Sequence, residues 1–265
     1  ANATISAADN LLLVGDGRNY TNTLSLGANT LTLNTTSATG VTPHNLNAYA
    51  EVWDPSNLVI SAQITGTGGL TKTGAGTATL INFPGNTYTG DTTITGGKLI
   101  VDGGGDAPII SSTNVTVGNA SATNASTANS VALQMGETAG SVVSVNNLIG
   151  TSSSSSATTS MTVYADGLFN MNGGSNALVN LSLQGGHVAG GGSNSLLTLT
   201  GGLTSTASDR TALIDGGNLA MSANAFAVNV AQGTTSSGTD LQIDSILQNG
   251  VGYTGGTAGT SLTKT

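Results

Sequence analysis

The side chains that could carry out acid–base chemistry are few and scattered. Asp91, Asp102 and Asp106 fall within one short stretch, with Lys98 between them. Enzymes that cleave polysaccharides use clustered acids to bind calcium or move protons, and a cation to stabilise developing charge. Asp102 and Asp106 flank three glycines, which is typical of a solvated turn, and a companion set of Arg and Lys is missing nearby. We therefore expect no catalytic residues and predict that the protein is not an enzyme.

The remaining titratable groups favour structural roles over metal or nucleophile chemistry. Asp209, Arg210 and Asp215 form one compact charged group, which we interpret as a surface ion pair. His44 and His187 lie far apart without acidic neighbours in the sequence, and His187 follows two glycines, as a turn residue does. The chain has no cysteine, which removes thiolate metal sites and disulfides. We predict no metal site and no cofactor.

One aromatic-bearing segment is a candidate binding site. The stretch from Thr35 to Asp54 has an unusually rich composition for this chain. It contains His44, Tyr49 and Trp53. Aromatic faces with a polar edge are suited to contacts with sugars. We name Tyr49, Trp53 and His44 as candidate residues for binding a glycan or a host protein. The alternative is that Trp53 covers the hydrophobic core.

The amino-acid composition limits the fold classes and the binding partners that the chain can have. Hydrophobic residues make up 37% of the 265 residues, but charged residues only 7% and aromatic residues 3%. Small aliphatic side chains suit a narrow core, such as that of a parallel β-solenoid, better than a thick sandwich. The net charge of −8 argues against binding nucleic acid, whose phosphates need a basic surface. No apolar run is long enough for a transmembrane helix, so we expect no membrane insertion by this segment.

The spacing of hydrophobic residues predicts short strands. Alternating runs recur along nearly the whole chain, and glycine or asparagine turns interrupt them. No segment predicts a helix. Two segments are interpreted as surface loop excursions, namely Thr35–Asp54 and the serine-rich Thr151–Ser160.

The stretch from Gly66 to Leu99 shows this pattern most clearly. Its sequence contains Gly68-Gly69-Leu70-Thr71-Lys72-Thr73-Gly74, then Asn86-Thr87-Tyr88-Thr89-Gly90, then Thr92-Thr93-Ile94 and Gly97-Lys98-Leu99. These sequence motifs resemble the autotransporter-associated β-strand repeat of surface-exposed bacterial passenger regions. The resemblance implies an all-β, right-handed parallel β-helix at an extracellular location on the bacterial cell surface. We expect Leu70, Leu80, Ile94 and Leu99 to point inward.

A partial second copy lies at the end of the chain. Residues 259–265 echo the start of the stretch at 66–99, and Ala1–Ile5 resembles what would follow. We expect a single β-solenoid domain over 1–265. Strand edges at solenoid ends are normally protected, so we hypothesise that copies self-associate head to tail. The alternative is that both ends continue into neighbouring repeats of a longer passenger. The candidate assembly residues are Ala3 and Ile5 at one end and Leu262 and Lys264 at the other.

Three functions remain open at this point. The first is a structural or adhesive surface rod, or a filament building block. The second is a polysaccharide-active β-helix enzyme. The third is a module that uses 35–54 to bind a glycan or host protein. Clustered acids on adjacent coils would favour the enzyme, and axial contacts between copies would favour the rod.

Overall fold

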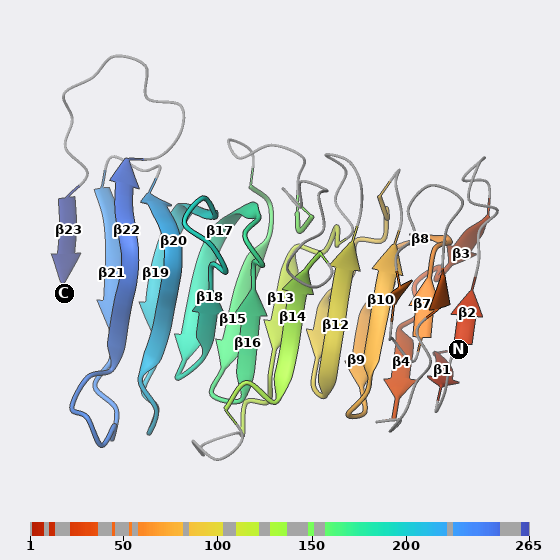
Figure 1. The fold of residues 1–265 in the computed structure, drawn as a ribbon, viewed down its shortest axis with the longest axis horizontal. Helices are drawn as coiled ribbons and strands as arrows, with labels where there is room; N and C mark the ends of the chain where they lie inside the picture. Colours follow the sequence, from red (N-terminus) through yellow and green to blue (C-terminus); the bar gives the residue numbers. More distant parts are fainter. Residues whose placement is uncertain are drawn as a thin grey trace.

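The chain winds as a right-handed parallel β-helix. The computed structural model describes residues 2–7, 11–13, 22–36, 44–45, 53–54, 58–81, 85–102, 110–121, 128–136, 148–150, 157–221, 225–249 and 261–264. These residues include no helix, and hence none that could cross a membrane. Successive coils lie side by side along the long axis, with the two chain ends at opposite ends of the rod (Figure 1). The predicted fold class is confirmed.

Each coil contributes to three faces, which we call A, B and C in chain order. Face A contains β1 (Ala3–Ala7), β4 (Leu31–Thr35), β9 (Leu70–Thr73), β11 (Thr92–Ile94), β13 (Asn114–Val117), β15 (Ser160–Tyr164), the second halves of β17 (Ser175–Gln184) and β19 (Leu196–Ser205), β21 (Ala225–Val230) and β23 (Ser261–Lys264). Face B contains β2 (Leu11–Leu13), β7 (Leu58–Ile60), β10 (Thr77–Ile81), β12 (Gly97–Asp102), β14 (Val131–Met135), β16 (Gly167–Asn170), β18 (His187–Ala189) and the first halves of β20 (Ala212–Met221) and β22 (Leu241–Asn249).

Face C is the least regular. It contains β3 (Thr23–Ser25) and β8 (Gln63–Thr65), a bridge between Ile110 and Ile149, the first halves of β17 and β19, and the second halves of β20 and β22. Where regular pairing lapses, buried asparagine side chains replace it. Asn86 Oδ1 accepts from Ile64 N at 2.8 Å, and Asn176 Oδ1 accepts from Ile149 N at 3.1 Å. Buried backbone groups need such partners.

The core is a set of aliphatic ladders along the axis. In β4 and β9 buried and half-buried residues alternate, because successive side chains of a strand point to opposite faces. Leu70, Leu80, Ile94 and Leu99 are each at most 1% exposed, as expected from the sequence. Val115 and Met161 continue the Leu70 ladder into the next coils.

Glycines let successive coils approach closely at the corner between faces A and B. Gly74 has φ of 73°, and a Cβ there would lie 2.1 Å from the Thr35 carbonyl oxygen of the preceding coil. Gly97 has φ of 60°, and its Cβ would lie 2.2 Å from the Gly76 carbonyl oxygen. A side chain at either position would strain the backbone and push the coils apart.

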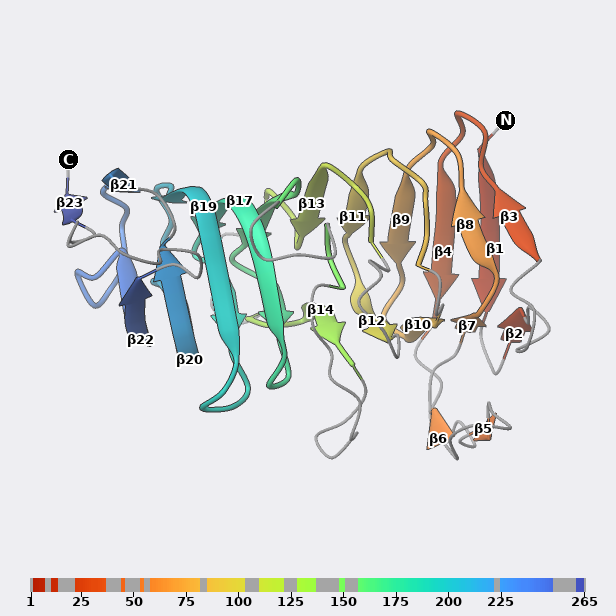
Figure 2. The same cartoon turned by 90° about the horizontal axis from the view of Figure 1, so that it is seen from above.

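The first excursion leaves the rod as a short hairpin. Strands β5 (His44–Asn45) and β6 (Trp53–Asp54) pair antiparallel and project away from face A (Figure 2). The second excursion is shorter than predicted. Ser160 begins β15, and the buried Thr159 hydroxyl donates to the Ser112 carbonyl at 2.6 Å, while residues 151–156 lie outside the described residues.

Candidate functional site

The acids of the repeat region do not gather into one site. Asp91 precedes β11 on face A, where its Oδ1 accepts a 3.0 Å hydrogen bond from Asn114 Nδ2. Lys98 lies on face B, with Nζ 3.3 Å from Gln134 Oε1. Asp106 lies outside the described residues. The fold therefore places Asp91 on a different face from Lys98 and Asp102, which both lie on β12.

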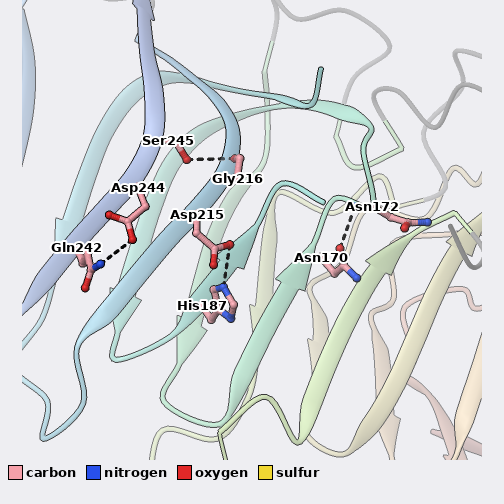
Figure 3. A network of polar contacts seen from close by, with 8 residues as sticks. All are labelled: Asn170, Asn172, His187, Asp215, Gly216, Gln242, Asp244 and Ser245. Atoms are coloured by element: carbon pink, nitrogen blue, oxygen red, sulfur yellow. Dashed lines mark hydrogen bonds and ion pairs between the residues drawn. The ribbon is translucent and has the colours of Figure 1, made fainter. Parts of the chain in front are cut away.

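A polar cluster lies instead on face B towards the C-terminal end (Figure 3). His187, Asp215 and Asp244 belong to three successive coils, at positions that alternate with the buried Val188 and Ile214. Their side chains therefore point away from the core. Asp215 and Asp244 are direct partners on neighbouring strands, which stacks two carboxylates.

His187 is the titratable side chain of the cluster that lies beside a carboxylate of the next coil. Its Nε2 lies 3.1 Å from Asp215 Oδ1, although the alignment does not make a hydrogen bond. The expectation that His187 is a turn residue without an acidic neighbour is wrong: it begins β18, and the coil geometry supplies Asp215. The interpretation of Asp209, Arg210 and Asp215 as one ion pair is also wrong. Arg210 Nη1 donates to the Ala165 carbonyl, and burial lowers the pKa of this guanidinium.

The other polar groups of the cluster bind one another. Gln242 Nε2 donates to Asp244 Oδ2 at 2.6 Å, and Ser245 Oγ donates to the Gly216 carbonyl at 3.2 Å. A histidine–carboxylate pair can orient an imidazole for proton transfer. Ser245, the neighbouring hydroxyl, is hydrogen-bonded to the backbone of the preceding coil. In the described part of the chain, no group of three or more His, Cys, Asp or Glu side chains could hold a metal ion.

Lys72 is a buried cation inside the repeat. It occupies a core position between Leu33 and Ile94 and is 0% exposed. Its ammonium donates to the carbonyls of Thr73, Gly74 and Gly96 at 2.8, 3.0 and 2.9 Å, which uses all three of its protons. Burial lowers the pKa of Lys72 to about 8, so the side chain is mostly charged at neutral pH. Lys72 therefore fastens the A–B corners of two coils together.

A chain of buried hydroxyls lies in the same repeat. Tyr88 Oη is 2.8 Å from Thr92 Oγ1, which is 2.6 Å from Ser112 Oγ, and Ser112 Oγ is 2.6 Å from the Gly90 carbonyl oxygen. A carbonyl only accepts, so Ser112 donates to Gly90, Thr92 donates to Ser112 and Tyr88 donates to Thr92. Burial raises the pKa of Tyr88 to about 12, so the phenol stays protonated.

The sequence marked Lys72 and Tyr88 as repeat residues but gave neither a role. Their networks include hydrogen bonds across coils, between residues 20 or more positions apart, such as Lys72 with Gly96 and Thr92 with Ser112. A lysine and a tyrosine in otherwise aliphatic or small-residue runs were the only signals in the sequence that could have pointed to them.

The structure brings two of the three aromatic-segment candidates together. His44 pairs with Asp54, and Asn45 with Trp53, across the β5–β6 hairpin. His44 and Trp53 are therefore close along the hairpin backbone, while Tyr49 lies outside the described residues. Whether these residues bind a ligand stays a prediction.

The candidate assembly residues lie at opposite ends of the rod. Ala3 is exposed and Ile5 half-buried on β1, which pairs with β4. Leu262 and Lys264 are on β23, opposite Phe226 and Val228 of β21. All four lie on face A, in the terminal strands of the described coils.

With the fold known, a comparison with protein families identifies the repeat. Residues 70–101 match the model of the passenger-associated transport repeat. This stretch is a passenger-type repeat. The match covers β9 to β12 and nearly coincides with the predicted repeat at 66–99. Together with the parallel β-helix it fits a passenger-type surface protein, for which an extracellular location is implied. Comparisons with curated proteins and with solved structures found no match.

Proposed function

We propose that the protein is a non-enzymatic structural or adhesive rod on the bacterial cell surface. The observation that supports this most directly is the passenger-type repeat built into a continuous β-helix. Polar groups of the repeat, such as Lys72 and Tyr88, and of the face B cluster, such as Ser245, bind other groups of the fold. Such interactions hold coils together and leave these groups less free to act on a substrate. The proposal includes no cofactor and no nucleic-acid partner.

We further propose that the rods join head to tail. Ile246 and Leu247 on β22 are 63% and 47% exposed, the largest exposed hydrophobic side chains in the described part of the chain. Both lie in the last described coil, where the side of β22 away from β20 carries no paired strand among the described residues. A second copy could continue every face, with β1 beside β23 and with β2 and β3 beside the two halves of β22. Such a joint does not close and gives a filament.

Electron microscopy at increasing protein concentration tests the filament. We expect lengths that grow with concentration, and Leu247→Lys should shorten them because it places a charge in the joint. The matched control is Leu213→Lys, which changes the same residue type at a half-buried position on the side of the rod. Particles of one fixed size at every concentration would overturn self-association.

One observation favours an enzyme as a second candidate. His187, Asp215 and Asp244 meet on adjacent coils of face B, as the enzyme hypothesis requires of an acidic cluster. Unsaturated product from pectate or alginate, lost in Asp215→Asn, would support this alternative over the rod. We expect no product.

A glycan-binding role rests on the β5–β6 hairpin, where Trp53 lies across from Asn45, next to the His44–Asp54 pair. Glycan-array binding that disappears in Trp53→Ala while the melting temperature is unchanged would support it. Binding that persists in this variant would place the contact elsewhere.

A further inference from the structure

Face A carries a continuous column of hydroxyl side chains on its outer surface. The strand register pairs each member directly with the next, from one end of the rod towards the other. The column consists of Thr4, Thr32, Thr71, Thr93, Thr116, Thr162, Ser182, Thr204 and, in place of a hydroxyl, Asn229. Most coils on this face therefore present the same functional group at the same place.

The hydroxyls of this column are available to solvent. Thr4 is exposed, and the threonines from Thr32 to Thr204 are half-buried, as expected for side chains standing side by side on a sheet. The structure's described groups offer them no hydrogen-bond partner, in contrast to the buried hydroxyls of Thr92 and Ser112. The column therefore holds hydroxyls that the fold itself does not use.

The buried side of the same strands holds the column in position. Thr71 lies between Leu70 and Lys72, and Thr93 lies between Thr92 and Ile94. These four neighbours are each at most 1% exposed. The three hydrogen bonds of Lys72 tie the adjoining corners of two coils. The spacing of the threonines is thus set by core packing and backbone pairing and does not depend on a ligand.

At some coils further hydroxyls flank the column. Thr30 stands two residues from Thr32, Thr73 from Thr71, Thr95 from Thr93 and Thr206 from Thr204, on the same outer face. Neighbouring parallel strands are about 4.8 Å apart, and residues i and i+2 of one strand are roughly 6.6 Å apart. The flanking row beyond the column also contains Asn34, Tyr164 and Gln184, and its threonine hydroxyls bind other groups of the fold, such as Thr73 Oγ1 with Asn34 Oδ1. The array is therefore regular along the column and only partial across it.

Charge is nearly absent from this array. The column itself contains no ionisable and no aromatic side chain, and Asp91 and Tyr164 stand at its two flanks. The ionisable groups of the polar cluster, His187, Asp215 and Asp244, lie on face B. Figure 2 shows β1, β4, β9, β11 and β13 along one edge of the rod, with the β5–β6 hairpin on the opposite side.

We propose that face A is a binding surface for crystalline water, that is, for a face of ice. The oxygen atoms of ice repeat at distances comparable to the strand spacing in one direction and to the i, i+2 spacing in the other. Threonine hydroxyls at this spacing can take lattice positions, while the adjacent methyl groups exclude disordered water. Water-mediated hydrogen bonds of this kind are nearly as favourable in enthalpy as direct ones. The many weak contacts of one column add up because they form on one rigid body.

A polysaccharide fits this surface less well. Recognition of sugars relies on aromatic platforms and on a few convergent polar groups in a concave site. The column is a repetitive and uncharged sheet surface with no concave site, and Tyr164 is a single ring at its flank. This inference goes beyond the proposed structural role and does not depend on filament formation, since one rod carries the whole column.

Growth of an ice crystal in a dilute solution of the fluorescently labelled protein tests the proposal. We expect the wild-type protein to enter the ice, and Thr93→Tyr to be excluded because its ring breaks the array. Thr87→Tyr is the matched control. It introduces the same ring in the same repeat at an exposed position between the buried Asn86 and Tyr88, on face C, and should enter the ice like the wild type.

Thr93→Val guards against a folding defect, because it keeps the side-chain shape and replaces the hydroxyl with a methyl group. Each variant is compared at an unchanged melting temperature. Exclusion of the wild-type protein from ice would overturn the proposal. Equal loss of incorporation into ice in Thr87→Tyr and Thr93→Tyr would overturn it as well. The same holds if neither Thr93→Tyr nor Thr93→Val loses incorporation into ice. So would binding to crystalline cellulose or chitin without binding to ice.

Discussion

Replacing Lys72 with methionine removes a buried charge while keeping the length of the side chain. The ammonium of Lys72 donates three hydrogen bonds to carbonyls at the corners of two coils. Hydrogen bonds to a charged group contribute about 1.5–3 kcal/mol each, so three contribute roughly 4–9 kcal/mol. Against this stands the cost of burying the charge.

The lowered pKa gives the size of that cost. A change from 10.5 to about 8 corresponds to roughly 3.5 kcal/mol at about 1.4 kcal/mol per pKa unit. The balance predicts that Lys72→Met lowers the free energy of unfolding by about 3 kcal/mol at pH 7. For a chain of this size the melting temperature should fall by roughly 6–12 °C.

The effect should depend on pH in a defined direction. Because the folded pKa of Lys72 lies below the unfolded value, the unfolded chain binds more protons between pH 8 and 10.5. The wild type should therefore gain stability relative to Lys72→Met as the pH rises through this window, and the difference should be constant below pH 8. Thermal unfolding followed by circular dichroism at several pH values measures both quantities.

Lys98→Met is the matched control. Lys98 belongs to the same repeat but is half-buried on face B and donates one 3.3 Å hydrogen bond to Gln134. We expect a change of at most about 1 kcal/mol. If the two variants melt at the same temperature, the three hydrogen bonds of Lys72 contribute no net stability and the reasoning fails.

Two further substitutions test the core. Leu80→Asp places an unpaired charge in a site that is 1% exposed and should lower the free energy of unfolding by several kcal/mol. Leu168→Asp, on the outside of face B, should lower it far less. Equal melting temperatures of the two variants would contradict the inward assignment of Leu80. Tyr88→Phe removes the first donor of the hydroxyl chain and should cost about 1 kcal/mol in chemical denaturation, with Tyr164→Phe at a half-buried position as the control. Ultraviolet titration of the wild type should show one tyrosine ionising near pH 12, and its absence would show that Tyr88 is not buried as described.

The sequence predicted the fold because the β-helix is a local and periodic structure. Alternation in runs such as Leu70–Thr73 reports which side chains face the core, and glycines such as Gly74 mark corners. Both signals lie within a few residues of one another. The family resemblance at 66–99 then supplied the handedness, which no spacing can give.

The contacts between coils could not be read in the same way. His187 and Asp215 are 28 residues apart, and they meet only because the two strands pair in register. Coil length is not constant, so the partner of a given residue cannot be counted from the sequence. Met161 pairs with Leu181, 20 residues later, whereas Val115 pairs with Met161, 46 residues later. For the same reason the threonine column becomes visible only after the register is known.

This variation in coil length has a consequence for evolution. Between Leu31 and Leu70, which are direct partners on face A, the chain accommodates the whole β5–β6 hairpin without shifting the register on either side. Because each coil contacts only its neighbours, an inserted segment at a corner leaves distant coils unchanged. Natural selection can therefore lengthen or exchange corner segments while the spine is conserved. A lineage carrying this architecture can acquire new recognition surfaces without inventing a new fold.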